Sequence, residues 1–325
     1  QLLPVVFLMS SELGGQALYP STIARTPRGY VMGPTLVPGT LALFDSGGSF
    51  IGTFGRHGAG PGEMREVYAV GPWFGDSVAA YHDRNQATVF AADLHYSRQV
   101  IFQSASFLLR GGIPVAPDTV LALRKGTGGG SDFALREFTD NGHPGRGYGE
   151  SAPFGQGRIY TSTGFAGDTV WAVAAESYEI DLFLRPSGIR LATVARKLSW
   201  FPSQPIPNEW GGTPRVQDAI YAGDGKFWML IRRPRPEFRL ENTVRSGTQL
   251  EPTHRIQPSV GDFAARFEYL LELVNLTEGT VEATMSLNDQ VPEGFLDRDH
   301  IYGYLEDRDT GSITIVVWRI HLSQG

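Results

Sequence analysis

The sequence predicts an all-β protein built from six similar antiparallel sheets. The 325 residues include 40 glycines and 21 prolines, and only 19% are charged, which suits many short strands joined by tight turns. One pattern recurs: an apolar strand, a short polar turn, a second apolar strand and a polar or glycine-rich connection. The turns near Ser46, Asp93, Asn141 and Ser187 are roughly 46 residues apart, a period typical of β-propellers. We therefore predict an all-β, six-bladed β-propeller that forms a single domain over residues 1–325.

The clearest repeat runs from Phe44 to Met64, with the sequence FDSGGSFIGTFGRHGAGPGEM. An apolar strand ends at Phe44, a turn of Asp, Ser and two Gly follows, and a second strand at Phe50–Phe54 leads into a glycine-rich loop. Asp and Gly tolerate the positive φ that a tight hairpin turn requires. The stretch therefore predicts a hairpin followed by a connection between blades.

Similar strands lead into each turn, and another apolar strand precedes each of them. The strands before the turns are Leu41–Phe44, Ala87–Phe90, Phe133–Phe138, Tyr178–Leu184, Phe267–Val274 and Ile313–Ile320. The strands that come just before these in the sequence begin at a turn residue and continue with β-branched and aromatic residues: Gly29–Met32, Asp76–Tyr81, Asp118–Leu123, Asp168–Val173, Gly225–Leu230 and Asp299–Tyr304. The best helix candidate, Asp262–Leu273, competes with one of these strands.

These strands divide the chain into blades at about 17–56, 65–103, 105–150, 158–195, 213–287 and 295–322. The last blade lacks an outer strand. We expect Val5–Ser10 to supply it and so to close the ring without exposed sheet edges. Blade five also contains a polar insertion at about 232–265, in which the run RRPRP resists regular strand structure because Pro lacks a donor and fixes φ.

The stretch from Asp45 to Met64 resembles a motif of bacterial six-bladed β-propellers related to NHL-repeat proteins, fd-x-x-G-x-f-v-x-x-iG-x-x-G-x-GPGEf. Tyr81–Phe90 resembles the NHL pattern v-x-D-x-x-n-x-r-v-x-v-f. The resemblance implies export to a periplasmic or extracellular space, and most members of the family have no assigned activity. Lys125 and Arg232 stand where Asp is expected, so a ring of carboxylates is not implied. The matching residues of the first motif are Asp45, Gly48, Phe50, Ile51, Gly55, Gly58, Gly60, Pro61, Gly62 and Glu63.

Composition excludes several functions. The net charge of -6 and the isoelectric point near 5.7 argue against nucleic acid as a partner and against a polybasic membrane-binding face. The absence of cysteine excludes disulfides, thiol catalysis and zinc–thiolate sites. No run reaches the roughly 20 apolar residues of a membrane-spanning helix, so we expect no transmembrane segment.

Candidate binding residues follow the strands that we interpret as innermost, at one end of the central channel. Their mixed charges suit a polar ligand or a protein partner. The seven histidines are scattered, so we expect no metal or other cofactor, although the carboxylates leave a calcium site open. With Arg235 from the insertion, the candidates are His82, Asp83, Arg124, Glu176, Arg232, Arg233, Arg235, Glu306 and Asp307.

The loop Gly58–Glu63 could cradle a phosphate, but it lacks the Lys-Ser/Thr of a P-loop. We predict a structural role, with Glu63 accepting backbone N–H groups, and a similar role for Gly147–Glu150. Among the tryptophans, we expect Trp171, Trp228 and Trp318 in the core, and Trp73, Trp200 and Trp210 on an exposed binding surface.

No G-x-S-x-G nucleophile motif is present, which favours a non-enzymatic protein without settling the question. The main hypothesis is an exported binding or scaffold module. It would dock a protein partner, a membrane-complex subunit among the candidates, through loops on one face, with the blade-five insertion as either a docking arm or a passive loop. The alternative is a propeller hydrolase or lyase with a cation-assisted site at the channel mouth.

Overall fold

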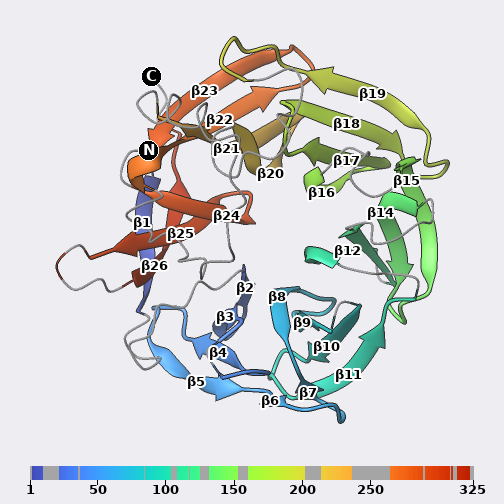
Figure 1. Ribbon diagram of the computed structural model, residues 1–325, viewed down its shortest axis with the longest axis vertical. Coiled ribbons are helices and arrows are strands. Elements are labelled where there is room, and N and C mark those ends of the chain that lie inside the picture. The colour runs from blue at the N-terminus through green and yellow to red at the C-terminus, as the bar shows by residue number, and fades with distance from the viewer. Residues whose placement is uncertain are drawn as a thin grey trace, which may run out of the picture.

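The computed structural model describes residues 2–9, 22–35, 37–83, 85–103, 108–116, 118–124, 132–152, 160–201, 214–235, 264–287, 290–307, 309 and 313–322. Six four-stranded antiparallel sheets are arranged in a ring around a central axis, as predicted (Figure 1). The strands of blades one to three are β2 (Thr22–Thr26), β3 (Gly29–Gly33), β4 (Leu41–Phe44) and β5 (Phe50–Phe54); β8 (Val67–Pro72), β9 (Val78–His82), β10 (Gln86–Phe90) and β11 (Tyr96–Ile101); β12 (Leu108–Ala116), β13 (Thr119–Arg124), β14 (Asp132–Thr139) and β15 (Pro144–Ala152).

Blades four to six complete the ring. Their strands are β16 (Tyr160–Ala166), β17 (Thr169–Ala174), β18 (Glu179–Leu184) and β19 (Arg190–Ala195); β20 (Arg215–Gly223), β21 (Lys226–Pro234), β22 (Phe267–Asn275) and β23 (Thr280–Leu287); β24 (Val291–Asp297), β25 (His300–Glu306), β26 (Ile313–Ile320) and β1 (Leu2–Met9). The helix candidate near residue 262 proves to be mainly strand β22, preceded by a helical turn at 264–266.

The innermost strands are β2, β8, β12, β16, β20 and β24, which lie nearest the centre of the ring in Figure 1. The strands that the sequence pattern marked as innermost are therefore the second strands of their blades. The true innermost strands pack side by side around the axis, where small and polar residues fit, and so they lack a clear apolar pattern. β16, for example, reads YTSTGFA.

The N-terminal strand closes the ring, as predicted. β1 pairs antiparallel with β26, and Leu8 lies opposite Ile315. Val6 and Leu8 are buried in the core that blade six shares with its neighbours, whereas Phe7 is 49% exposed. Gly48, in the first hairpin turn, has φ +93, and a Cβ there would collide with the Phe7 carbonyl oxygen, so this glycine permits the close approach of blade one to β1.

Apolar side chains fill the spaces between adjacent blades. Trp171, Trp228 and Trp318 are buried, as predicted. Trp73 was expected on the surface but is 5% exposed, and its ring packs edge-on against Phe74. Trp200 is half-buried, and Trp210 lies outside the described residues.

The glycine-rich loop has the structural role that its sequence predicts. Its ends form the short parallel pair β6 (Arg56–His57) and β7 (Glu63–Met64). Glu63 Oε2 accepts the Gly60 N–H at 2.8 Å, and Glu63 Oε1 lies 2.9 Å from Arg56 Nε. The hydrogen bond from Gly60 is the main reason that the pKa of Glu63 is lowered. The similar role expected for Gly147–Glu150 was wrong, because these residues belong to the outer strand β15.

Candidate functional site

The strand registers define two faces of the disc. His82 at the end of β9 lies opposite Val67 at the start of β8, and Arg232 near the end of β21 lies opposite Arg215 at the start of β20. The second strands thus end where the innermost strands begin. We call this the top face and call the face where the innermost strands end the bottom face.

The sequence candidates share the top face but come from five blades. Blade two provides His82 and Asp83, blade three Arg124, blade four Glu176, blade five Arg232, Arg233 and Arg235, and blade six Glu306 and Asp307. Within the described part of the chain, no three His, Cys, Asp or Glu side chains form a group that could hold a metal ion. The calcium site and the expectation of no cofactor stay predictions, which metal analysis of the purified protein tests.

His82 is 1% exposed, and both of its ring nitrogens have partners inside blade two. Nδ1 lies 3.0 Å from Asp83 Oδ2, and Nε2 lies 2.9 Å from the Thr88 hydroxyl. Burial lowers the pKa of the imidazole, and Asp83 partly opposes this shift. The local geometry therefore gives His82 a packing role and fixes the neighbouring carboxylate at the rim.

Blade five places a row of polar side chains on its side facing blade six. Arg215, Arg232 and Tyr269 lie opposite one another on β20, β21 and β22, and so their side chains share one side of the sheet. The Arg232 guanidinium lies 4.5 Å from the centre of the Phe267 ring. Burial raises the pKa of Tyr269 to about 12, with Arg232 opposing the shift. Arg215 and Tyr269 were missed in the sequence, and only the strand register identifies them.

The other side of blade five carries ion pairs toward blade four. Arg233 Nη2 lies 2.7 Å from Glu268 Oε2, and its guanidinium is 5.0 Å from the Trp200 ring centre. Deeper in the same space, the buried Glu272 accepts the Tyr178 hydroxyl at 2.7 Å and pairs with Arg196. Burial raises the pKa of Tyr178, and the charge of Glu272 adds to the shift. These contacts hold blades four and five together.

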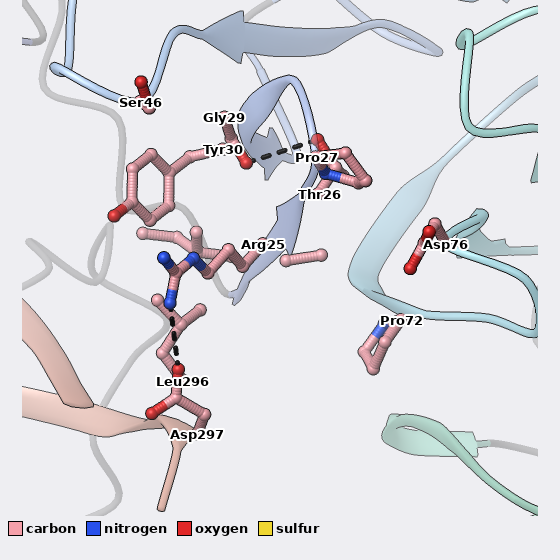
Figure 2. Close-up of a pocket in the computed structure, with 12 residues that line it drawn as sticks. Arg25, Thr26, Pro27, Gly29, Tyr30, Ser46, Pro72, Asp76, Leu296 and Asp297 are labelled. Carbon is pink, nitrogen blue, oxygen red and sulfur yellow. Dashed lines mark hydrogen bonds and ion pairs between the residues drawn. The ribbon is translucent and has the colours of Figure 1, made fainter. Parts of the chain in front are cut away.

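A pocket of about 510 Å³ opens on the bottom face between blades one, two and six (Figure 2). Its polar side chains come from short turns and strand ends, whereas Ile23, Pro72 and Leu296 provide apolar walls. Figure 2 shows the Arg25 guanidinium between Tyr30 and Asp297, with Asp76 across the opening. Burial is the main reason that the pKa of Tyr30 is raised, and the positive charge of Arg25 opposes this increase. The volume lies within the range of small-molecule sites.

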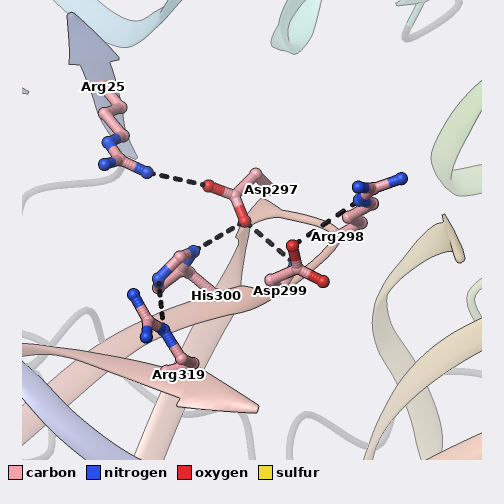
Figure 3. Close-up of polar contacts among 6 residues, drawn as sticks. All are labelled: Arg25, Asp297, Arg298, Asp299, His300 and Arg319. Carbon is pink, nitrogen blue, oxygen red and sulfur yellow. Dashed lines mark hydrogen bonds and ion pairs between the residues drawn. The ribbon is translucent and has the colours of Figure 1, made fainter. Parts of the chain in front are cut away.

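A chain of polar contacts supports this pocket (Figure 3). Asp297 Oδ2 lies 3.5 Å from Arg25 Nη1, and Asp297 Oδ1 accepts the Asp299 N–H at 2.9 Å. His300 Nδ1 is 2.8 Å from the same Oδ1 atom, and His300 Nε2 is 3.5 Å from Arg319 Nε. Nδ1 therefore donates to the carboxylate and Nε2 accepts from Arg319. Our sequence reasoning missed this pocket because residues in tight turns were interpreted only as turn formers.

No protein-family model matches the chain, and no curated protein sequence matches it. Solved structures do share its shape. A protein from Bacteroides fragilis that is suspected to be exported has 12% identity and a TM-score of 0.57, with 99% of this chain and 95% of that chain covered. Hydrazine synthase from Kuenenia stuttgartiensis has 12% identity and a TM-score of 0.53, with 91% and 76% covered. BamB from Moraxella catarrhalis has 11% identity and a TM-score of 0.45, with 94% and 84% covered.

Within the residues that the structure describes, no helix is long and apolar enough to cross a membrane. The identities to the solved structures are too low to carry a function from one protein to another, since one fold hosts many functions. What the first two comparisons establish is a shared fold, which extends over 99% and 91% of this chain.

Proposed function

We propose that this protein is an exported, non-enzymatic binding or scaffold propeller that docks a protein partner through loops on its top face. The observation that carries the proposal is the ordered base of the blade-five insertion. Residues 233–235 and 266–268 form this base, which we call the stem. The intervening residues 236–263 lie outside the described part of the chain.

The stem rises above the rest of blade five. Among the described residues, the last pair between β20 and β21 is Arg215 with Arg232, and the last pair between β22 and β23 is Tyr269 with Leu287. Beyond them, β21 and β22 remain paired as far as Pro234 and Phe267, and the Arg235 N–H donates to the Arg266 carbonyl at 2.9 Å. The chain therefore leaves and re-enters the disc through a two-stranded ribbon.

Side chains brace this ribbon, which would be marginal on its own in water. Arg233 pairs with Glu268 and packs on Trp200, and the Ser286 hydroxyl donates to the other Glu268 oxygen at 3.0 Å. Arg235 Nε donates to the Ala264 carbonyl at 3.2 Å. A braced stem holds the attached insertion at a fixed place on the rim, as a docking arm requires.

The chemistry of the rim supports a protein partner. Arginines recognise carboxylates in a bidentate manner and stack on aromatic rings, and they are enriched at protein interfaces. We infer the extracytoplasmic location from the resemblance of residues 45–64 to NHL-like propellers, and the B. fragilis protein of the same fold, suspected of export, agrees with it. A membrane-associated complex is a suitable partner for an exported disc of this kind.

The test is site-specific photocrosslinking in the producing bacterium. A photoreactive amino acid replaces Arg235 on the stem in one strain and Arg28, in the bottom-face turn, in the control strain. We expect a discrete crosslinked adduct from position 235 and none of that mass from position 28. Replacing residues 236–263 with a short Gly/Ser linker should remove the adduct while the melting temperature stays within a few degrees, because loop closure depends weakly on length.

Adducts of equal yield from both positions, or an adduct that persists after the loop replacement, would contradict docking through the insertion. Failure of the shortened protein to fold would show instead that the insertion is part of the core. Fractionation of the same cells tests export separately, because a cytoplasmic protein would refute the location without affecting the interface.

A further inference from the structure

Arg215 and Arg232 form a pair of like charges for which the described chain provides no ion pair. They are directly opposite on β20 and β21, and both are half-buried. Among the described residues, the carboxylate of Glu293 on β24 attracts Arg232, and no ion pair is found between the two side chains. Arg215 itself lowers the pKa of Arg232, a smaller effect than that of burial. Two positively charged side chains therefore lie together where both are partly shielded from water.

This arrangement costs stability. Nε of Arg215 and Nε of Arg232 are both buried without a hydrogen-bond partner. A buried donor without a partner destabilises the folded state, and like charges directly opposite on neighbouring strands add to this cost. A guanidinium does not lose its proton in a protein, so neither residue avoids the cost by becoming neutral. Polar groups left in this state call for a specific explanation, such as an ion that the site is built to bind.

The surroundings indicate which ion would fit. Phe267 covers one face of the Arg232 guanidinium, and Tyr269 lies next to Arg232 in the row, with its hydroxyl near that guanidinium. Gln217 Nε2 donates to the Pro292 carbonyl at 2.9 Å and so joins the two blades below the row. Counted over the described residues, the two guanidinium groups and the Glu293 carboxylate leave a single positive charge, which one carboxylate group of a ligand would balance.

We propose that Arg215 and Arg232 bind a carboxylate on the top face, where blade five faces blade six. Planar guanidinium groups match the two oxygens of a carboxylate, and each charged hydrogen bond contributes enough to affect affinity about tenfold. The unpartnered oxygen of Gln217 suits a donor attached to the same ligand. The carboxylate is provided either by a small organic acid or by an acidic side chain of the docked partner. The proposal goes beyond the proposed function, because the two arginines could bind a free organic acid even if no protein partner docks on the top face.

Thermal unfolding at constant ionic strength tests the site directly. Sodium acetate and sodium succinate are compared with sodium chloride on the full chain. We expect a carboxylate to raise the melting temperature of the unmodified protein by about 2–4 °C and chloride to leave it unchanged. Arg215→Gln and Arg232→Gln should each abolish the rise. Arg98→Gln, which breaks the ion pair with Asp140 in another part of the ring, is the matched control and should keep the rise.

A second readout separates binding from a structural role. Without added acid, Arg215→Gln should be as stable as the unmodified protein or more stable, since one of two repelling charges is removed. If Arg215 only supports the fold, the same variant is less stable with and without acid. A lower melting temperature in the absence of acid, a carboxylate response that survives in Arg215→Gln, or no response of the unmodified protein to either acid overturns the proposal.

Crosslinking from position 235 distinguishes the two sources. If a partner provides the carboxylate, Arg215→Gln and Arg232→Gln reduce the adduct at least about tenfold, and succinate competes with it. If a small acid is the ligand, the thermal response is lost in both variants while the adduct is unchanged. If position 235 gives no adduct when the rest of the protein is unmodified, the proposed function is refuted. The thermal test of the carboxylate site does not depend on that result.

Discussion

The closure of the ring by β1 predicts a large cost for a single substitution near the N-terminus. Leu8 is fully buried between blade six and the adjoining core, opposite Ile315. Leu8→Ala removes three carbons, each contributing about 0.8 kcal/mol, and leaves a cavity that the neighbouring strands fill only partly. We expect the free energy of unfolding to fall by about 3–4 kcal/mol. Leu191 is the matched control, because it lies on the outermost strand β19 and is 54% exposed.

Urea unfolding followed by tryptophan fluorescence measures both effects, and Trp318 on β26 reports directly on the closing blade. Leu191→Ala should change the free energy of unfolding by about 0.5 kcal/mol or less. The slope of the free energy of unfolding against urea concentration should be the same in both variants and the unmodified protein. The difference in stability then appears as a shift of the urea concentration at the midpoint. If the two variants differ by less than about 1 kcal/mol, β1 does not contribute the packing that its register and burial imply.

Three further predictions follow from individual contacts. Glu63→Gln should lower the melting temperature at neutral pH. Because the pKa of Glu63 is lowered in the folded protein, this difference should begin to shrink as the pH falls below the unfolded value of about 4.3 and should vanish below the folded pKa. Scanning calorimetry of both proteins over a series of pH values from neutral downward measures the difference. The lowered pKa of His82 means that the unfolded chain takes up the proton first, so stability should decline as the pH falls from about 7 to 5. His82→Gln should flatten that part of the profile, and an unchanged slope would assign it to other groups. Arg196→Ala leaves the buried carboxylate of Glu272 without its cation and should lower the free energy of unfolding in urea by about 3 kcal/mol. A loss under about 1 kcal/mol would mean that the hydrogen bond from the Tyr178 hydroxyl is enough to stabilise the buried carboxylate.

The sequence predicted the ring of blades because the outer parts of each blade have strong local signals. The turn at Asp45–Gly48 and the strand on either side follow ordinary hairpin rules, and the same pattern recurs at a steady spacing. The N-terminal strand could also be predicted, because the last blade lacked a partner strand. Glu63 was assigned a backbone-binding role correctly, since a carboxylate three residues after a glycine can reach that N–H group.

The innermost strands and the site residues were harder to predict. A strand that packs among five similar strands around a narrow axis takes small and polar residues, which sequence patterns do not distinguish from loops. The pairing of Arg215 with Arg232 depends on register across a hairpin, and the bottom pocket depends on three turns that are far apart in the sequence. Trp73 was misplaced because its glycine- and proline-rich neighbours suggested a surface loop, whereas the turn folds its ring into the space beside Phe74. In each case the missing information is which segments meet in space.

The pairing of β1 with β26 sets the order in which the protein can reach its finished form. β1 is synthesised before β26, the strand that it pairs with, and it has Leu3, Val5 and Phe7 on its exposed side. Until that partner has been synthesised, the strand has no native neighbour along its edge, while blades one to five can already assemble from local hairpins. The ring therefore closes only when two strands that are far apart in the sequence, β1 and β26, pair with each other. During that interval a second copy of the chain offers the same complementary strand, and so crowded synthesis should favour exchanged dimers over closed monomers.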